Sequence, residues 1–102
     1  MGDFIYKSAT ELVELIRNGK ATSTEIVKDH LKQIKKHNST LNAVVILLED
    51  EALKTAAQCD DEAKQGKFRG PLHGVPMTIK EQYWLKGTKS TLNFKMLKDW
   101  TA

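Results

Sequence analysis

The chain has 102 residues, of which 28% are charged and 40% are hydrophobic, and its formal net charge is +3. This balance is typical of one small folded domain and is too apolar for a disordered segment. An excess of 16 Lys and Arg over 13 Asp and Glu is too small to predict nucleic acid or an anionic membrane as a partner. The longest purely apolar run, 43–48, is far shorter than the roughly 20 residues of a membrane helix.

The single cysteine, Cys59, excludes an internal disulfide. The first residues carry neither the basic region nor the apolar region of a secretory signal. We therefore expect a cytoplasmic protein. The sequence makes no prediction of an oligomeric state.

Two helices are predicted near the start of the chain, at about 8–18 and 23–37. Ser8 precedes Glu11, and Thr22 precedes Glu25, at the spacing of a capping box. The apolar residues that follow at helical spacing are Leu12, Val13, Leu15 and Ile16 in the first helix, and Ile26, Val27, Leu31 and Ile34 in the second. The other side of the second helix carries Lys28, Lys32, Lys35 and Lys36. We interpret it as a solvated face rather than a phosphate-binding one, because acidic residues lie nearby.

The middle of the chain predicts a strand, a third helix and a second strand. The continuous apolar run at 43–48 indicates a strand that is buried on both faces. The third helix is predicted at 49–65, with Gly66 as its C-terminal cap and with mostly small inward residues, namely Ala52, Ala56, Cys59 and Ala63, beside Leu53 and Ala57. In 75–80, apolar residues alternate with Pro76, Thr78 and Lys80, which predicts the second strand.

These elements indicate the α/β class, with helices packed on an incomplete mixed β-sheet. Two strands are too few for a covered sheet, because sheets of this kind rarely stop at two. We therefore interpret residues 1–102 as the N-terminal part of a single longer domain.

Residue types that can act in catalysis or bind a metal are scattered along the chain. His30, His37 and His73 are far in sequence from Cys59 and from paired carboxylates, and the glycines match no nucleotide-binding or Gly-x-Ser-x-Gly pattern. We therefore expect no metal and no cofactor. His73 is interpreted as a hydrogen-bonded loop residue in preference to a catalytic base, and Cys59 as a small core residue in preference to a nucleophile.

The segment 70–81 reads Gly-Pro-Leu-His-Gly-Val-Pro-Met-Thr-Ile-Lys-Glu. It resembles the amidase signature hydrolases, whose N-terminal part carries a Gly-Pro-Leu-His-Gly-Val-Pro-x-x-x-Lys-Asp stretch. The likeness covers nearly the whole chain, because the Thr-Ser-Thr-Glu-Ile start of the second helix, Leu41-Asn42-Ala43 and the Ala-rich third helix occur in the same order. Glu81, in place of the usual Asp, and the Ser-Thr-Leu stretch at 90–92 also resemble the fatty-acid-amide-hydrolase-like branch.

The resemblance implies that Lys80 is the catalytic base of a Ser–cisSer–Lys triad that hydrolyses carboxamides of small molecules. Both triad serines belong to a glycine- and serine-rich signature that these 102 residues lack, so we expect the chain alone to be inactive. A lysine amine acts as a base only when burial lowers its pKa. From the residues alone, Lys80 is a solvent-facing side chain, and only the resemblance assigns it this role.

Two alternatives remain open. The first is the amidase subunit of a tRNA-dependent amidotransferase, which shares the same motif and would work with partner subunits. The second is a catalytically dead binding or scaffold fragment, retained for its contacts alone. The acyl and amine groups of the substrate are not specified by these residues.

Overall fold

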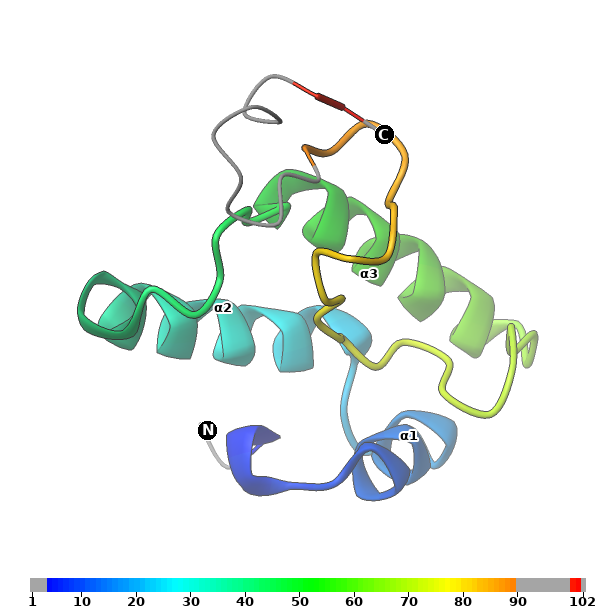
Figure 1. Cartoon of the computed structure of the whole chain (residues 1–102). Helices are drawn as coiled ribbons and strands as arrows, with labels where there is room; N and C mark the ends of the chain where they lie inside the picture. The colour runs from blue at the N-terminus through cyan, green and yellow to red at the C-terminus, as the bar shows by residue number, and fades with distance from the viewer. Residues whose placement is uncertain (1–3, 90–99, 102) are drawn as a thin grey trace.

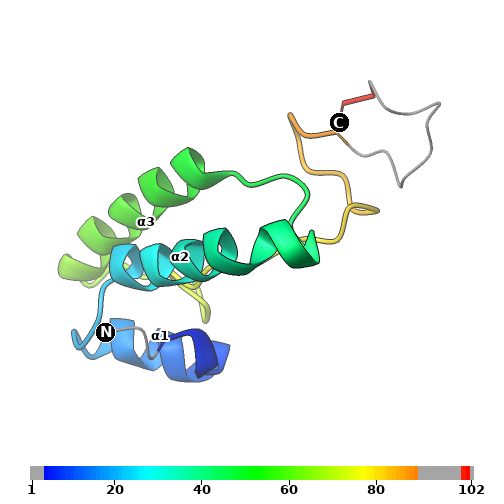
Figure 2. The same ribbon diagram turned by 90° about the vertical axis from the view of Figure 1, so that its left-hand side faces the viewer.

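The computed structural model describes residues 4–89 and 100–101. A short 3-10 helix, η1 (Phe4–Tyr6), precedes the helices α1 (Ala9–Arg17), α2 (Ser23–Leu41) and α3 (Glu49–Lys64). Helix α2 lies between α1 and α3, as Figures 1 and 2 both show. The chain that follows α3 runs back along the helices and then leaves them toward the C-terminus (Figure 1).

Both predicted capping boxes are confirmed. The Ser8 hydroxyl accepts a hydrogen bond from the Glu11 backbone N–H, and the Glu11 carboxylate accepts one from the Ser8 N–H, both at 3.2 Å. Thr22 and Glu25 repeat this exchange at 3.1 Å for both bonds. The boxes satisfy N–H groups that have no partner within a helix, and they therefore fix where α1 and α2 begin.

Helix α2 continues beyond its predicted end at residue 37. It ends at Leu41 because Asn42 adopts the left-handed conformation, with φ at 50°. The Asn38 side chain then bonds the backbone of Val44 through both its amide nitrogen and its oxygen, at 2.8 and 2.9 Å. These contacts turn the chain away from the helix.

The core forms two clusters along α2. The first holds Leu12, Ile16, Ala21 and Ile26, and the second holds Val27, Leu31 and Ala56. The predicted inward faces of α1 and α2 are thus confirmed. On α3, Ala56 and Cys59 are buried as expected, whereas Ala57 is exposed. Small side chains on this face let α3 lie close to α2.

The two predicted strands are wrong for the described residues, which contain three helices and only one isolated bridge, between Lys89 and Thr101. Segments 43–48 and 75–80 are irregular and do not pair with each other. A strand forms when its N–H and C=O groups find a neighbouring strand, and neither segment has one here. Their apolar side chains stay in contact with water, as with Val45 and Met77, which are 73% and 74% exposed.

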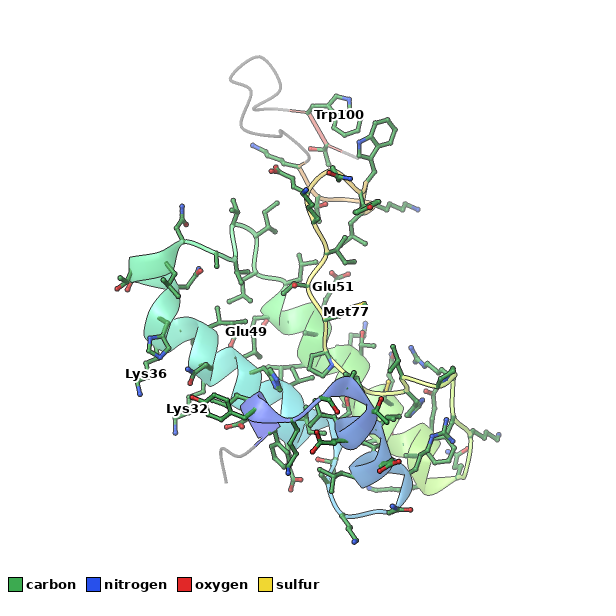
Figure 3. All side chains as sticks on the ribbon, turned by 60° about the horizontal axis from the view of Figure 1, so that its bottom comes forward. Lys32, Lys36, Glu49, Glu51, Met77 and Trp100 are labelled. Atoms are coloured by element: carbon green, nitrogen blue, oxygen red, sulfur yellow. The ribbon has the colours of Figure 1, made fainter. Side chains whose placement is uncertain are left out.

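The last described residues lie apart from the helices. The rings of Trp84 and Trp100 contact each other at a centroid distance of 4.9 Å. Figure 3 shows Trp100 well away from the helices, whereas Lys32 and Lys36 project outward from α2. Ser90 and Thr91 lie outside the described residues. Every helix in the described ranges is too short or too polar to cross a lipid bilayer.

We predict that Ile26→Ala lowers the free energy of unfolding by about 2–5 kcal/mol, because Ile26 has no exposed surface and its loss leaves a cavity. Urea denaturation of the 102-residue chain measures this. Ile46→Ala removes the same atoms from a side chain that is 42% exposed and serves as the control, with an expected loss below about 1 kcal/mol. Equal losses would contradict the placement of the core.

Candidate functional site

The motif segment 70–76 is held by contacts from all three α-helices. It follows a loop that opens at Gly66, whose φ of 72° terminates α3 as the sequence predicted. Arg17 of α1, Ser23 of α2 and Cys59 of α3 each bond a residue of the motif. The motif is therefore positioned by the helical core rather than by a β-sheet.

The first part of this arrangement is a junction between α2 and α3. The Asp60 carboxylate of α3 accepts hydrogen bonds from the backbone N–H groups of Ser23, at 2.6 Å, and Thr24, at 3.2 Å, and from the Thr24 hydroxyl. A carboxylate at this position satisfies free N–H groups and complements the positive end of the α2 dipole. Asp60 thereby fixes the first turn of α2 against α3.

Ser23 connects this junction to the motif. Its hydroxyl donates a hydrogen bond to the Gly74 carbonyl oxygen at 2.6 Å, and the residue is only 1% exposed. Gly74 has φ at +80°, and a Cβ there would lie 3.0 Å from Ile16 Cδ1 and 3.1 Å from Ser23 Cβ. Glycine is required for both its conformation and its small size.

His73 has both ring nitrogens in hydrogen bonds. The Arg69 backbone N–H donates to Nδ1 at 2.9 Å, so the ring hydrogen lies on Nε2, which donates to the Cys59 carbonyl oxygen, also at 2.9 Å. The ring is buried and meets Phe68 edge to face at 5.2 Å. The interpretation of His73 as a hydrogen-bonded loop residue is confirmed.

Two arginines hold the outer side of the loop. Arg17 donates to the Gly70 carbonyl oxygen at 3.0 Å, and its guanidinium lies 4.6 Å from the centre of the Phe68 ring. Arg69 bonds Glu62 at 2.6 Å, and this hydrogen bond holds the pKa of the Glu62 carboxyl below its usual range. Both arginines are exposed, so we expect them to add less stability than the buried contacts of Ser23 and His73.

His73 lies close to Cys59 in space, although the two are separated in the sequence. The loop brings ligand atoms of Cys59, Glu62 and His73 to within 4.8 Å of one another, because residues 66–73 fold back over the end of α3. Sequence separation gave no indication of this return. However, both His73 nitrogens are engaged, Glu62 is paired with Arg69, and burial raises the pKa of the Cys59 thiol. The cluster is therefore explained as a hydrogen-bonded anchor for the loop.

Lys80 lies beyond the anchored part of the motif. Its side chain is exposed, as are those of Met77, Thr78 and Ile79, and its carbonyl oxygen accepts a hydrogen bond from the Tyr83 N–H at 3.0 Å. Among the described residues, none buries the Lys80 side chain. The environment expected for a neutral amine is thus not formed here, and the catalytic role of Lys80 stays a prediction.

The surface near Lys80 is an open apolar groove. It is bordered by α2, α3, segment 43–48 and segment 70–89. Exposed apolar side chains of both irregular segments line it, namely Val45, Ile46, Leu47, Leu48, Met77 and Ile79. The groove therefore carries the residues that the sequence predicted to lie inside a sheet.

Ser23, Asp60 and Arg17 were missed as site residues. They contact partners 37, 51 and 53 residues away in the chain, and such separations leave no periodic signal. In the sequence, the Thr-Ser-Thr-Glu-Ile start of α2 indicated only a capping box and a resemblance to the amidase signature hydrolases. What distinguishes Ser23 is its burial, which requires the tertiary structure.

Gly74→Ala is predicted to destabilise the chain by about 1–3 kcal/mol, because the new Cβ meets Ile16 and Ser23 and the backbone has positive φ. Gly70→Ala is the matched control, since a Cβ there meets open space and its φ lies outside the positive range. Thermal and urea denaturation compare the two variants. A Gly74 variant as stable as the Gly70 variant would contradict the close packing.

Cys59 is predicted to react with iodoacetamide at least about 10-fold more slowly in the folded chain than in urea. Burial raises its pKa and blocks access, and the thiolate is the reactive form. Because the folded pKa exceeds the unfolded one, the contribution of Cys59 to stability falls as the pH rises above ~8.5. Mass spectrometry follows the alkylation, and equal rates in both states would show that the thiol is accessible.

Comparison with known proteins relates this geometry to a family. The family model described as Amidase matches residues 25–102. A subunit of the glutamyl-tRNA(Gln) amidotransferase of Endomicrobium trichonymphae is 38% identical over 102 residues, which are 100% of this chain and 21% of the relative. An indoleacetamide hydrolase of Bradyrhizobium diazoefficiens is 39% identical over 95 residues, or 93% of this chain and 18% of the relative.

A third relative, Amidase 2 of Gibberella moniliformis, is 34% identical over 84 residues, which are 81% of this chain and 16% of the relative. The chain thus spans about a fifth of the length of the curated relatives that it matches. The family model covers most of the chain, including the whole motif from Gly70 to Lys80. The chain belongs to the amidase family.

Proposed function

We propose that the protein containing this chain hydrolyses carboxamide bonds, with Lys80 as its general base. The observation that carries the proposal is the Gly70–Lys80 motif, which lies within the part of the chain that matches the amidase family. The anchoring of Gly70, His73 and Gly74 by three helices supports a structural purpose for the first half of the motif. Within the motif, the resemblance to the amidase signature hydrolases assigns the chemistry to Lys80.

In the proposed reaction, the neutral Lys80 amine takes a proton from a bridging serine held by a cis peptide bond. That serine takes the proton of the nucleophilic serine, whose oxygen attacks the carbonyl carbon of the amide. The C–N bond breaks, the amine leaves with the returned proton, and water then hydrolyses the acyl-enzyme. Both serines belong to a glycine- and serine-rich segment outside these 102 residues.

Lys80 must lose contact with water to act as a base, because burial disfavours the charged ammonium. The apolar groove beside it supports this part of the proposal. Val45, Met77, Ile79 and Lys80 all line the groove, so polypeptide that filled the groove would also lower the exposure of Lys80. Covering apolar surface of this kind is favourable by about 25 cal/mol per Å².

A second candidate is the amidase subunit of a glutamyl-tRNA(Gln) amidotransferase. The 38% identity with the amidotransferase subunit of Endomicrobium trichonymphae over the full 102 residues favours it. The protein would then use the same amide chemistry with partner subunits. Glu81 and the Ser-Thr-Leu residues at 90–92 favour instead the fatty-acid-amide-hydrolase-like branch. The scaffold alternative predicts neither amidotransferase activity nor amide hydrolysis.

The test uses the complete protein encoded by the reading frame that contains this chain. We expect a fluorophosphonate probe to label one serine, and Lys80→Ala to lower amide hydrolysis by at least about 100-fold, as expected for loss of a general base. Lys86→Ala is the control, because Lys86 is also an exposed lysine of the same segment. The 102-residue chain itself should not be labelled.

Labelling that persists together with hydrolysis unaffected by Lys80→Ala would contradict the role of Lys80. Absence of any labelled serine would favour the scaffold alternative. Activity that needs added partner subunits and glutamyl-tRNA(Gln) would favour the amidotransferase over a free amidase.

A further inference from the structure

We propose that Ser23 is a positioning residue of the amidase site, which acts by fixing Gly74 and thereby the start of the segment that carries Lys80. The inference rests on the proposed function of Lys80. It extends the site to a side chain on a different helix, 51 residues away from Gly74 in the sequence. Ser23 contacts neither the substrate nor the reacting atoms in this proposal.

The Ser23 hydroxyl has a single defined orientation in the structure. Its residue is 1% exposed, and its oxygen lies 2.6 Å from the Gly74 carbonyl oxygen, to which it donates. Its backbone N–H donates to Asp60 at 2.6 Å, so the serine is held from α3 on one side while it holds the motif on the other. A buried carbonyl that lost this donor would be left without a partner, which costs more than an exposed contact would.

Gly74 is restrained at its carbonyl oxygen and at its Cα. Its carbonyl oxygen is bonded by Ser23, and its Cα packs against Ile16 and Ser23 without room for a Cβ. The residue before it, His73, is bonded to Cys59, and the residue after it, Val75, packs against the first core cluster. The exposed segment that leads to Lys80 begins after these held residues, at position 77.

A fixed Gly74 limits where Lys80 can lie, because only residues 75–79 separate the two. Pro76 has a fixed φ and keeps Val75 out of the helical region, which restricts the direction in which the chain leaves Gly74. Segment 75–80 is irregular in the structure. The anchor at Gly74 therefore sets where the short segment that carries Lys80 starts.

Two other features of the molecule do not indicate a ligand or a role. The Cys59, Glu62 and His73 cluster has its nitrogen and oxygen donors already in hydrogen bonds. The exposed pair Trp84 and Trp100 has no polar group in the described residues that specifies a ligand for it. Ser23, in contrast, makes a buried and directional contact with the motif itself.

The first experiment measures hydrogen exchange in the 102-residue chain. We expect Ser23→Ala to speed exchange of the His73 and Val75 amides, which donate to the carbonyl oxygens of Gly70 and Leu72, by at least about 10-fold. Ser8→Ala is the matched control, because it also removes a serine hydroxyl from the N-terminus of a helix but does not contact the motif. Unchanged exchange in Ser23→Ala, or equal changes in both variants, would overturn the anchoring step and with it the proposal.

The second experiment measures kcat and KM in the complete protein. Ser23→Ala is expected to lower kcat by at least about 10-fold, with KM changed by less than about 2-fold, because substrate binding is retained while the base is misplaced. Ser8→Ala should change neither value. Ser23→Ala with the kcat of Ser8→Ala, in a protein that loses activity in Lys80→Ala, would overturn the positioning role alone. A protein whose activity does not depend on Lys80 would overturn the proposed function, and the positioning role with it.

Discussion

The part-buried hydrogen bond between the hydroxyl of the buried Ser23 and the Gly74 carbonyl oxygen joins the helices to the motif, and the other contacts are arranged around it. Asp60 holds the serine from α3, and Ile16 of α1 packs against Gly74. A polar contact in a buried position is directional, and leaving either partner unsatisfied costs about 1–3 kcal/mol. Apolar packing of three helices would tolerate small shifts of the loop, whereas this bond does not.

The motif therefore divides into two parts with different physical roles. Between Gly70 and Gly74, backbone and side-chain groups form hydrogen bonds with Arg17, Ser23, Cys59 and Arg69. From Met77 to Lys80 the side chains are exposed. An anchored loop that delivers an exposed segment is a common way for a fold to carry chemistry on a rigid support. His73 belongs to the anchored part of the motif.

The irregular segments occur in a chain that spans about a fifth of the length of the relatives that it matches. Its radius of gyration is 15.2 Å, whereas a compact chain of this length has about 13 Å. Apolar residues at 43–48 and 75–80 remain exposed, and the matched relatives are roughly five times as long. Backbone groups of a strand need neighbours, so a β-prone sequence alone does not produce a sheet.

Sequence by itself determined the local features. Contacts within a few residues explain the capping boxes at Ser8 and Thr22, the apolar faces of α1 and α2, and the glycine at the end of α3. The motif at 70–81 was sufficient to indicate the family. Only the tertiary structure decided that Ser23 meets Gly74, that His73 meets Cys59, and that the predicted strands lack partners. These outcomes depend on groups far apart in the chain, and hydrophobic periodicity carries no information about which distant groups meet.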